Sequence, residues 1–214
     1  MPKPLWRYFS HLPVSYLADV VADMMSPLAA AQLLVRLDLY PHFRGADVVD
    51  LFAGVCGWLM AFMYLPSHYA PRLWIAVDVD PRRLQICKLI SRDVGVDVVT
   101  IRRDLSTPYV LNNNVDVVVG SPPCHEFSVA TVSRRRRVDT GLALVRSYLE
   151  SVKAMNPVVA VMEEATTTTE GQRLVTQLVA QYGFKYGFYD LRDYGAIQYR
   201  RRRLIAWRTQ NQGM

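Results

Sequence analysis

The sequence predicts an α/β fold built on a doubly wound, mostly parallel sheet of seven strands. Two observations support this prediction. Short runs of β-branched residues alternate with stretches of helical periodicity, which is the pattern of consecutive βαβ units. The last two runs follow each other with only a loop between them, which favours antiparallel pairing at an edge of the sheet.

Helical stretches are expected to alternate with the first five strands. The predicted strands span residues 46–51, 73–79, 96–101, 115–119 and 157–162. The predicted helices span residues 58–65, 81–93, 141–155 and 170–182. Residues 184–191 and 203–207 should then form the antiparallel edge strand and its partner.

A helical extension, residues 1–44, is expected to pack on the domain formed by residues 45–214. Pro27 opens its second helix, around residues 29–37. Its first helix is indicated by apolar residues at helical spacing, which are Val14, Leu17, Val20, Val21 and Met24. A chain of 214 residues with 51% hydrophobic content fits a single domain overall.

The charge distribution indicates a polyanionic partner. Lysine and arginine number 25 against 19 aspartates and glutamates, which gives a net charge of +6. Arginine runs at 134–137 and 200–203 suit nucleic-acid contacts, and a solvated charged face is the alternative. No stretch is apolar enough for a membrane span and the N-terminus lacks a signal-peptide pattern, so we expect a cytoplasmic protein without membrane contact.

The three cysteines, Cys56, Cys87 and Cys124, lie far apart without CxxC spacing. This spacing argues against a disulfide framework and a structural zinc site, so reduced thiols and no metal are expected. Cys124 follows Gly120-Ser121-Pro122-Pro123 at the end of a valine-rich run. A thiol at the carboxyl end of a parallel strand is a candidate nucleophile, and a packed structural cysteine is the alternative.

A glycine-bearing turn, Phe52-Ala53-Gly54-Val55-Cys56-Gly57, follows the first predicted strand and Asp50. Such a turn lets a ligand approach the backbone closely. The second strand ends at Asp78, placed to accept hydrogen bonds from ribose hydroxyls, and the third ends at Asp104, a candidate for an adenine amino group. A nucleoside-bearing cofactor is therefore expected, with aspartates that only cap helices as the alternative.

The order of these segments along residues 46–208 resembles that of the DNA cytosine-5 methyltransferase family. The matching blocks, in the family's order, are Asp50-Leu51-Phe52-Ala53-Gly54, Asp78, Asp104, Pro123-Cys124, Glu163 and Gln198-Tyr199-Arg200-Arg201-Arg202. The resemblance implies the Rossmann-like fold of S-adenosylmethionine-dependent methyltransferases. It also implies transfer of a methyl group from S-adenosylmethionine to C5 of cytosine in DNA.

The resemblance assigns roles to individual residues. The implied cofactor-binding residues are Asp50, Phe52, Ala53, Gly54, Gly57, Asp78, Val79, Asp104, Pro122 and Leu142, with Leu144 as the alternative to Leu142. The implied catalytic residues are Cys124, Glu163, Arg200 and Arg202, and Arg201 and Arg203 are expected to point away. The implied nucleic-acid contacts are Ser128, Arg134, Arg135, Arg136, Arg137 and Gln198, with the arginines in a basic loop over 125–141.

In the implied reaction Cys124 adds to C6 of a flipped-out cytosine while Glu163 holds or protonates N3. RNA remains an alternative substrate, as do a separate chain that supplies target recognition and a binding-only homologue without catalysis. The chain stops at Met214, before the family's target-recognition region, and residues 12–18 resemble the family's final helix. Residues that depart from the family pattern are Cys56, Val79, His125 and Glu164-Ala165.

Overall fold

The computed structural model describes residues 5–10, 12, 13, 15, 16, 20, 24–112, 114–123, 134–165, 168–196 and 203–210. For residues 5, 6 and 134–138 it describes the backbone alone.

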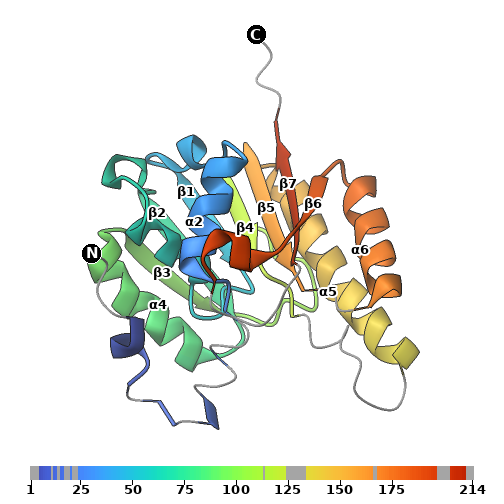
Figure 1. Ribbon diagram of the computed structural model, residues 1–214, viewed down its shortest axis with the longest axis horizontal. Helices are drawn as coiled ribbons and strands as arrows, with labels where there is room; N and C mark the ends of the chain where they lie inside the picture. The colour runs from blue at the N-terminus through green and yellow to red at the C-terminus, as the bar shows by residue number, and fades with distance from the viewer. Residues whose placement is uncertain are drawn as a thin grey trace.

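Among the described residues, seven strands form one sheet in the order β3-β2-β1-β4-β5-β7-β6 (Figure 1). The strands are β1 (Asp47–Leu51), β2 (Leu73–Asp78), β3 (Asp97–Arg102), β4 (Val117–Gly120), β5 (Val159–Glu164), β6 (Lys185–Tyr189) and β7 (Arg203–Thr209). The first five strands run parallel to one another, and β7 runs antiparallel to both β5 and β6. The predicted α/β class and the antiparallel pair at one edge are confirmed; the reversed strand, β7, lies one place in from the edge strand, β6.

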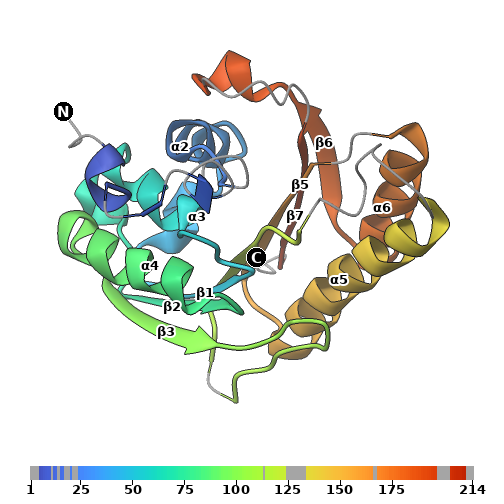
Figure 2. The same cartoon turned by 90° about the horizontal axis from the view of Figure 1, so that it is seen from below.

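Helices cover both faces of the sheet (Figure 2). One face carries α2 (Pro27–Arg36), α3 (Gly57–Met60) and α4 (Pro81–Val94), and the other carries α5 (Arg134–Met155) and α6 (Thr169–Gln181). Short 3-10 helices occur at Leu5–Tyr8, Tyr40–Phe43, Ala61–Met63, Ser67–Tyr69 and Leu191–Tyr194. Within the described ranges no helix is both long and apolar enough to cross a membrane.

The helix expected to start at residue 141 begins earlier, at Arg134. The arginine run 134–137 is therefore helical, and the prediction that it lies in a loop was wrong. A run of four arginines has no apolar periodicity, although arginine itself is a good helix former.

Alternation along β5 divides the core between the two faces of the sheet. Val159 and Val161 pack with α2 and α3, whereas Ala160 and Met162 pack with α5 and α6. The same alternation continues through the acidic end of the strand, so Glu163 and Glu164 project to opposite faces. Only Glu163 lies on the face that carries α2, α3 and α4.

The carboxyl group of Asp50 lies inside the core, and 1% of the surface of this residue is exposed. The indole N–H of Trp74 donates a hydrogen bond of 3.2 Å to its Oδ2. Burial raises the pKa of Asp50 well above its ordinary value, the Trp74 hydrogen bond lowers it, and the charge of Asp78 raises it again. The folded chain therefore favours the neutral acid at this position.

We expect Asp50→Asn to make the free energy of unfolding less sensitive to pH. The unfolded chain ionises Asp50 near the ordinary value of 3.8, and the folded chain only at higher pH. The wild type therefore loses stability as the pH rises above about 4 and until it passes the folded pKa. Asparagine removes this loss and still accepts from Trp74. Urea unfolding of both chains from about pH 4 to about pH 8 tests this, and parallel stability curves would contradict it.

Candidate active site

A cavity of about 430 Å³ opens at the carboxyl ends of the parallel strands, where α/β sheets bind their ligands. Loops after β1, β2, β3 and β4 line it, together with the N-terminal segment, α5, β5 and β7. The lining residues are Val20, Met24, Met25, Phe52, Ala53, Gly54, Val55, Gly57, Trp58, Asp78, Val79, Asp80, Arg83, Arg103, Asp104, Leu105, Ser121, Pro122, Pro123, Leu144, Glu163 and Arg203.

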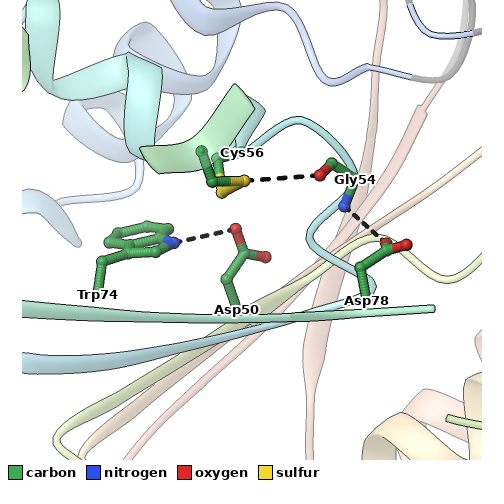
Figure 3. Close-up of a disulfide and its surroundings, with 6 residues drawn as sticks. Asp50, Gly54, Cys56, Trp74 and Asp78 are labelled. Carbon is green, nitrogen blue, oxygen red and sulfur yellow. Dashed lines mark hydrogen bonds between the residues drawn. A yellow bond between two sulfur atoms is a disulfide. The ribbon is translucent and has the colours of Figure 1, made fainter. Parts of the chain in front are cut away.

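Most residues of the turn after β1, residues 52–57, line this cavity, and Figure 3 shows the turn at Gly54 beside Asp78. Phe52, Gly54 and Cys56 have positive φ angles of 56°, 53° and 59°. Side chains disfavour this left-handed region, so the surrounding structure must hold the turn in place. The backbone N–H of Gly54 donates a hydrogen bond of 2.8 Å to Oδ2 of Asp78, which ties the turn to the end of β2.

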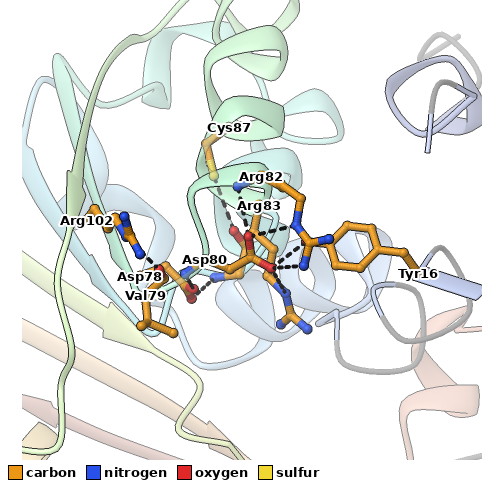
Figure 4. Close-up of polar contacts among 9 residues, drawn as sticks. Tyr16, Asp78, Val79, Asp80, Arg82, Arg83, Cys87 and Arg102 are labelled. Carbon is orange, nitrogen blue, oxygen red and sulfur yellow. Dashed lines mark hydrogen bonds and ion pairs between the residues drawn. The ribbon is translucent and has the colours of Figure 1, made fainter. Parts of the chain in front are cut away.

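Asp78 and Asp80 organise the end of β2 (Figure 4). Oδ1 of Asp78 accepts a 2.9 Å hydrogen bond from the N–H of Asp80, and Asp80 in turn caps α4 by accepting from the N–H of Arg82. The Tyr16 hydroxyl donates to Asp80 at 2.7 Å, and the Arg82 guanidinium lies 4.0 Å from the centre of the Tyr16 ring. Burial raises the pKa of Asp80, but hydrogen bonds from Arg82 and Tyr16 outweigh it and lower the pKa to about 2.

The N-terminal segment supplies a wall of the cavity through Val20, Met24 and Met25. Its approach to the turn is close, because a Cβ added at Gly57 would lie 2.5 Å from the carbonyl oxygen of Met25. From their spacing, Val20 and Met24 are expected to form the packing face of an extension. Helical spacing alone does not distinguish a core contact from a cavity wall.

A buried ion pair closes the other end of the cavity. Arg203 at the start of β7 forms a salt bridge with Glu163 at the end of β5, and each has 2% of its surface exposed. The expectation that Arg203 points away from the site was wrong. That expectation came from alternation along residues 200–203, but four consecutive arginines do not show which of them face the site. Arg203, the first described residue of β7, lines the cavity beside Glu163. Pairing with Glu163 compensates both buried charges.

Glu164 lies on the opposite face of the sheet from this pair, and 1% of its surface is exposed. Within the described part of the chain, its carboxyl oxygens have no hydrogen-bond partner. Burial raises the pKa of Glu164 well above its ordinary value, the charge of Glu163 raises it further, and Arg203 lowers it. These effects favour a neutral acid at Glu164 beside the charged pair.

The cavity brings together many of the residues predicted to bind a cofactor. These are Phe52, Ala53, Gly54, Gly57, Asp78, Val79, Asp104 and Pro122. Asp50 is instead buried beneath the turn, and Leu144 rather than Leu142 lines the cavity. Predicted residues that lie outside the described ranges are Cys124, Ser128, Gln198, Arg200 and Arg202, and the side chains of Arg134, Arg135, Arg136 and Arg137 are not described.

Cys56 and Cys87 form a disulfide, so the expectation of reduced thiols was wrong for this pair. The two residues are 31 positions apart, but the fold brings their Cα atoms to 5.4 Å, within the range that a disulfide can span. Cys56 precedes α3 and Cys87 lies within α4. The sequence spacing could not reveal this contact, because it depends on how α3 packs against α4.

Replacing Arg203 with methionine should lower the free energy of unfolding by about 3 kcal/mol, because it leaves the Glu163 charge buried without its cation. The double variant Arg203→Met/Glu163→Gln should lose less, since no charge is then stranded. Chemical denaturation of the wild type, both single variants and the double variant measures the coupling. Additive losses in this cycle would mean that the two side chains do not interact as described.

Comparison with known proteins gives the family. The model of the C-5 cytosine-specific DNA methylase family matches residues 46–213. The chain is 27% identical over 165 residues to the Type II methyltransferase M1.HphI of Haemophilus parahaemolyticus, covering 72% of this chain and 43% of the relative. It is 30% identical over 171 residues to the Type II methyltransferase M.AgeI of Thalassovita gelatinovora, covering 73% and 38% respectively. The chain thus spans less than half the length of these curated relatives.

Solved structures share the fold at low sequence identity. Magnesium protoporphyrin IX methyltransferase from Synechocystis PCC 6803 with bound SAH has a TM-score of 0.58 at 13% identity, covering 95% of this chain and 92% of that one. NSun6 from Pyrococcus horikoshii with SFG has a TM-score of 0.59 at 14% identity, covering 89% and 53%. The fold is therefore the Rossmann-like fold of S-adenosylmethionine-dependent methyltransferases. Because the family model covers well over half of its residues, the chain belongs to the C-5 cytosine-specific DNA methylase family.

Proposed function

We propose that this chain transfers a methyl group from S-adenosylmethionine to C5 of cytosine in DNA. The observation that supports this most directly is the cavity itself. It joins the strained turn after β1 to the buried Glu163–Arg203 pair at one edge of the sheet, in a chain of the cytosine C-5 methylase family. Methyl transfer requires the cofactor and the cytosine base to meet in one cavity. We propose that the turn after β1 holds the cofactor and that the Glu163–Arg203 pair lies beside the base.

The cavity residues fit the cofactor. Its volume of about 430 Å³ lies in the range of small-molecule sites. Phe52 and Val79 offer apolar surface, and each oxygen of the Asp78 carboxylate, already bound to one backbone N–H, has a further lone pair for a ribose hydroxyl. Asp104 is the proposed partner of the adenine amino group. When bound, the cofactor supplies an electrophilic methyl group.

Cys124 is the proposed nucleophile. Its thiolate adds to C6 of cytosine, which moves electron density to C5 and makes that carbon reactive toward the methyl group. Once C5 is methylated, loss of the C5 proton to a base and expulsion of the thiolate restore the free enzyme. The addition splits one difficult substitution into easier steps.

Glu163 is the proposed partner of the cytosine ring. Paired with the Arg203 guanidinium, its carboxylate accepts hydrogen bonds from the cytosine amino group and from N3 when N3 carries a proton. Such bonds stabilise the ring while Cys124 is attached. Arg200 and Arg202 remain proposed contacts to the base.

Nucleic acid is the proposed partner of the basic segments. The reaction requires the target base to leave the duplex, at a cost of a few kcal/mol that phosphate contacts offset. Arg134 to Arg137 occupy the first turn of α5. We propose that they contact phosphates and that Ser128 and Gln198 are further contacts to the nucleic acid. A separate recognition chain and an RNA substrate are alternatives that the assay below distinguishes.

Incubation of the chain with S-adenosylmethionine and duplex DNA should produce 5-methylcytosine, and Cys124→Ser should reduce the rate at least about a thousandfold because it removes the nucleophile. Nucleoside mass spectrometry of the digested DNA measures the product. A parallel reaction with RNA in place of DNA tests the RNA alternative. A reaction with added cell lysate, which could supply a recognition chain, tests the other alternative. Full activity of Cys124→Ser would contradict the assignment.

Tyr16→Phe should weaken S-adenosylmethionine binding about threefold, because it removes the hydrogen bond that holds the N-terminal wall to Asp80. Isothermal titration calorimetry measures the Kd. Tyr186→Phe is the matched control, since Tyr186 is an exposed residue of the edge strand and is not part of the cavity. Equal affinities in both variants would show that this wall does not shape the cofactor site.

A further inference from the structure

The Cys56–Cys87 disulfide joins the turn after β1 to the middle of α4. Both residues are completely buried. In Figure 3 the bond lies above the strands that carry Asp50 and Trp74, on the same side of the sheet as the turn. The bond therefore connects the floor of the cavity to the helix that Asp80 caps.

Cys56 is an unusual residue for its position in this turn. Its φ of 59° lies in the left-handed region, which glycine adopts freely and a side chain disfavours. Phe52 is the other residue of this turn that has a side chain and a positive φ, of 56°. A turn with two such residues needs restraints from its surroundings. The backbone of Cys56 makes local hydrogen bonds, from its N–H to the Ala53 carbonyl at 2.8 Å and from the Met60 N–H to its own carbonyl at 3.0 Å, and these do not reach α4.

The disulfide restrains the turn beside the residues that line the cavity. Sγ of Cys87 lies 3.6 Å from the carbonyl oxygen of Gly54, whose N–H is bound to Asp78. Val55 and Gly57, the two neighbours of Cys56, both line the cavity. The bond thus restrains a lining segment that contains side-chain-bearing residues at positive φ.

We propose that Cys56 and Cys87 are positioning residues whose disulfide holds the turn in its cofactor-binding shape, so that cofactor affinity depends on the redox state of the pair. This inference rests on the proposed function for the identity of the cofactor. Formation of the bond joins the two sulfurs and releases two protons and two electrons. A small-molecule disulfide accepts them and becomes two thiols, and dithiothreitol reverses the reaction as it closes to its own cyclic disulfide.

The test uses the full chain in a Cys124→Ser background, so that Cys56 and Cys87 are the remaining cysteines. Thiol titration after denaturation should find no free thiol in the oxidised chain and both after reduction. Calorimetry with S-adenosylmethionine should then give a Kd about tenfold higher for the reduced chain, because binding must also order the released turn. Free thiols in the oxidised chain, or an unchanged Kd after verified reduction, would overturn the proposal.

Two variants separate positioning from general stability. Cys87→Ala leaves a side chain at positive φ without its restraint and should bind as weakly as the reduced chain. Cys56→Gly/Cys87→Ala also lacks the bond, but glycine tolerates the left-handed conformation, so its Kd should return toward that of the oxidised chain. Both variants should unfold at lower temperature than the oxidised chain. Equal Kd values for the two variants would contradict a positioning role.

Hydrogen exchange of the ligand-free chain distinguishes failure of this proposal from failure of the proposed function. Reduction should accelerate exchange in a peptide that covers residues 52–58, because the Gly54 N–H loses part of its protection. An oxidised chain that binds no S-adenosylmethionine would overturn the proposed function. The exchange rates would then still decide whether the disulfide holds the turn, and equal rates in both redox states would refute it.

Discussion

The carboxylate of Asp78 accepts hydrogen bonds from two backbone N–H groups that belong to consecutive βα units. One is that of Gly54 in the turn after β1, and the other is that of Asp80 at the start of α4. The cavity depends on this arrangement, because the turn forms its floor and α4 is the anchor for the N-terminal wall. Tyr16 reaches the same helix end through Asp80. One buried side chain therefore sets the relative positions of three parts of the cavity.

At the other end of the cavity, the ionisable side chains at the end of β5 lie on opposite faces of the sheet. Glu163 and Arg203 form an ion pair on the cavity side. Glu164 occupies the opposite face, where no cation of the described residues forms a salt bridge with it. A second carboxylate directly after the proposed catalytic acid would repel it if both were ionised. The structure separates them by strand alternation and favours the neutral form of Glu164. The family departure at this position is thus compatible with the Glu163–Arg203 ion pair.

The sequence was sufficient for features that depend on local patterns. Valine-rich runs, and the lack of an apolar helical pattern in the sequence between the last two predicted strands, predicted the sheet, and Gly54, Asp78 and Asp104 do line one cavity. The contact of Cys56 with Cys87 was not predictable, because it arises from packing between helices that local spacing does not specify. Arg203 was misassigned because four consecutive arginines give no register. The wall formed by Met24 and Met25 also depends on tertiary packing, and its apolar spacing resembled that of any core helix.

The proposed roles of the cavity residues converge on one chemical step, the attack of Cys124 on a cytosine base at the end of the cavity that holds Glu163. Duplex DNA with 5-fluorocytosine tests it directly, because fluorine at C5 blocks the final elimination and traps the covalent intermediate. Mass spectrometry of the denatured mixture with S-adenosylmethionine should find the oligonucleotide attached to the peptide that contains Cys124. Absence of an adduct, or an adduct that persists in Cys124→Ser, would contradict the account.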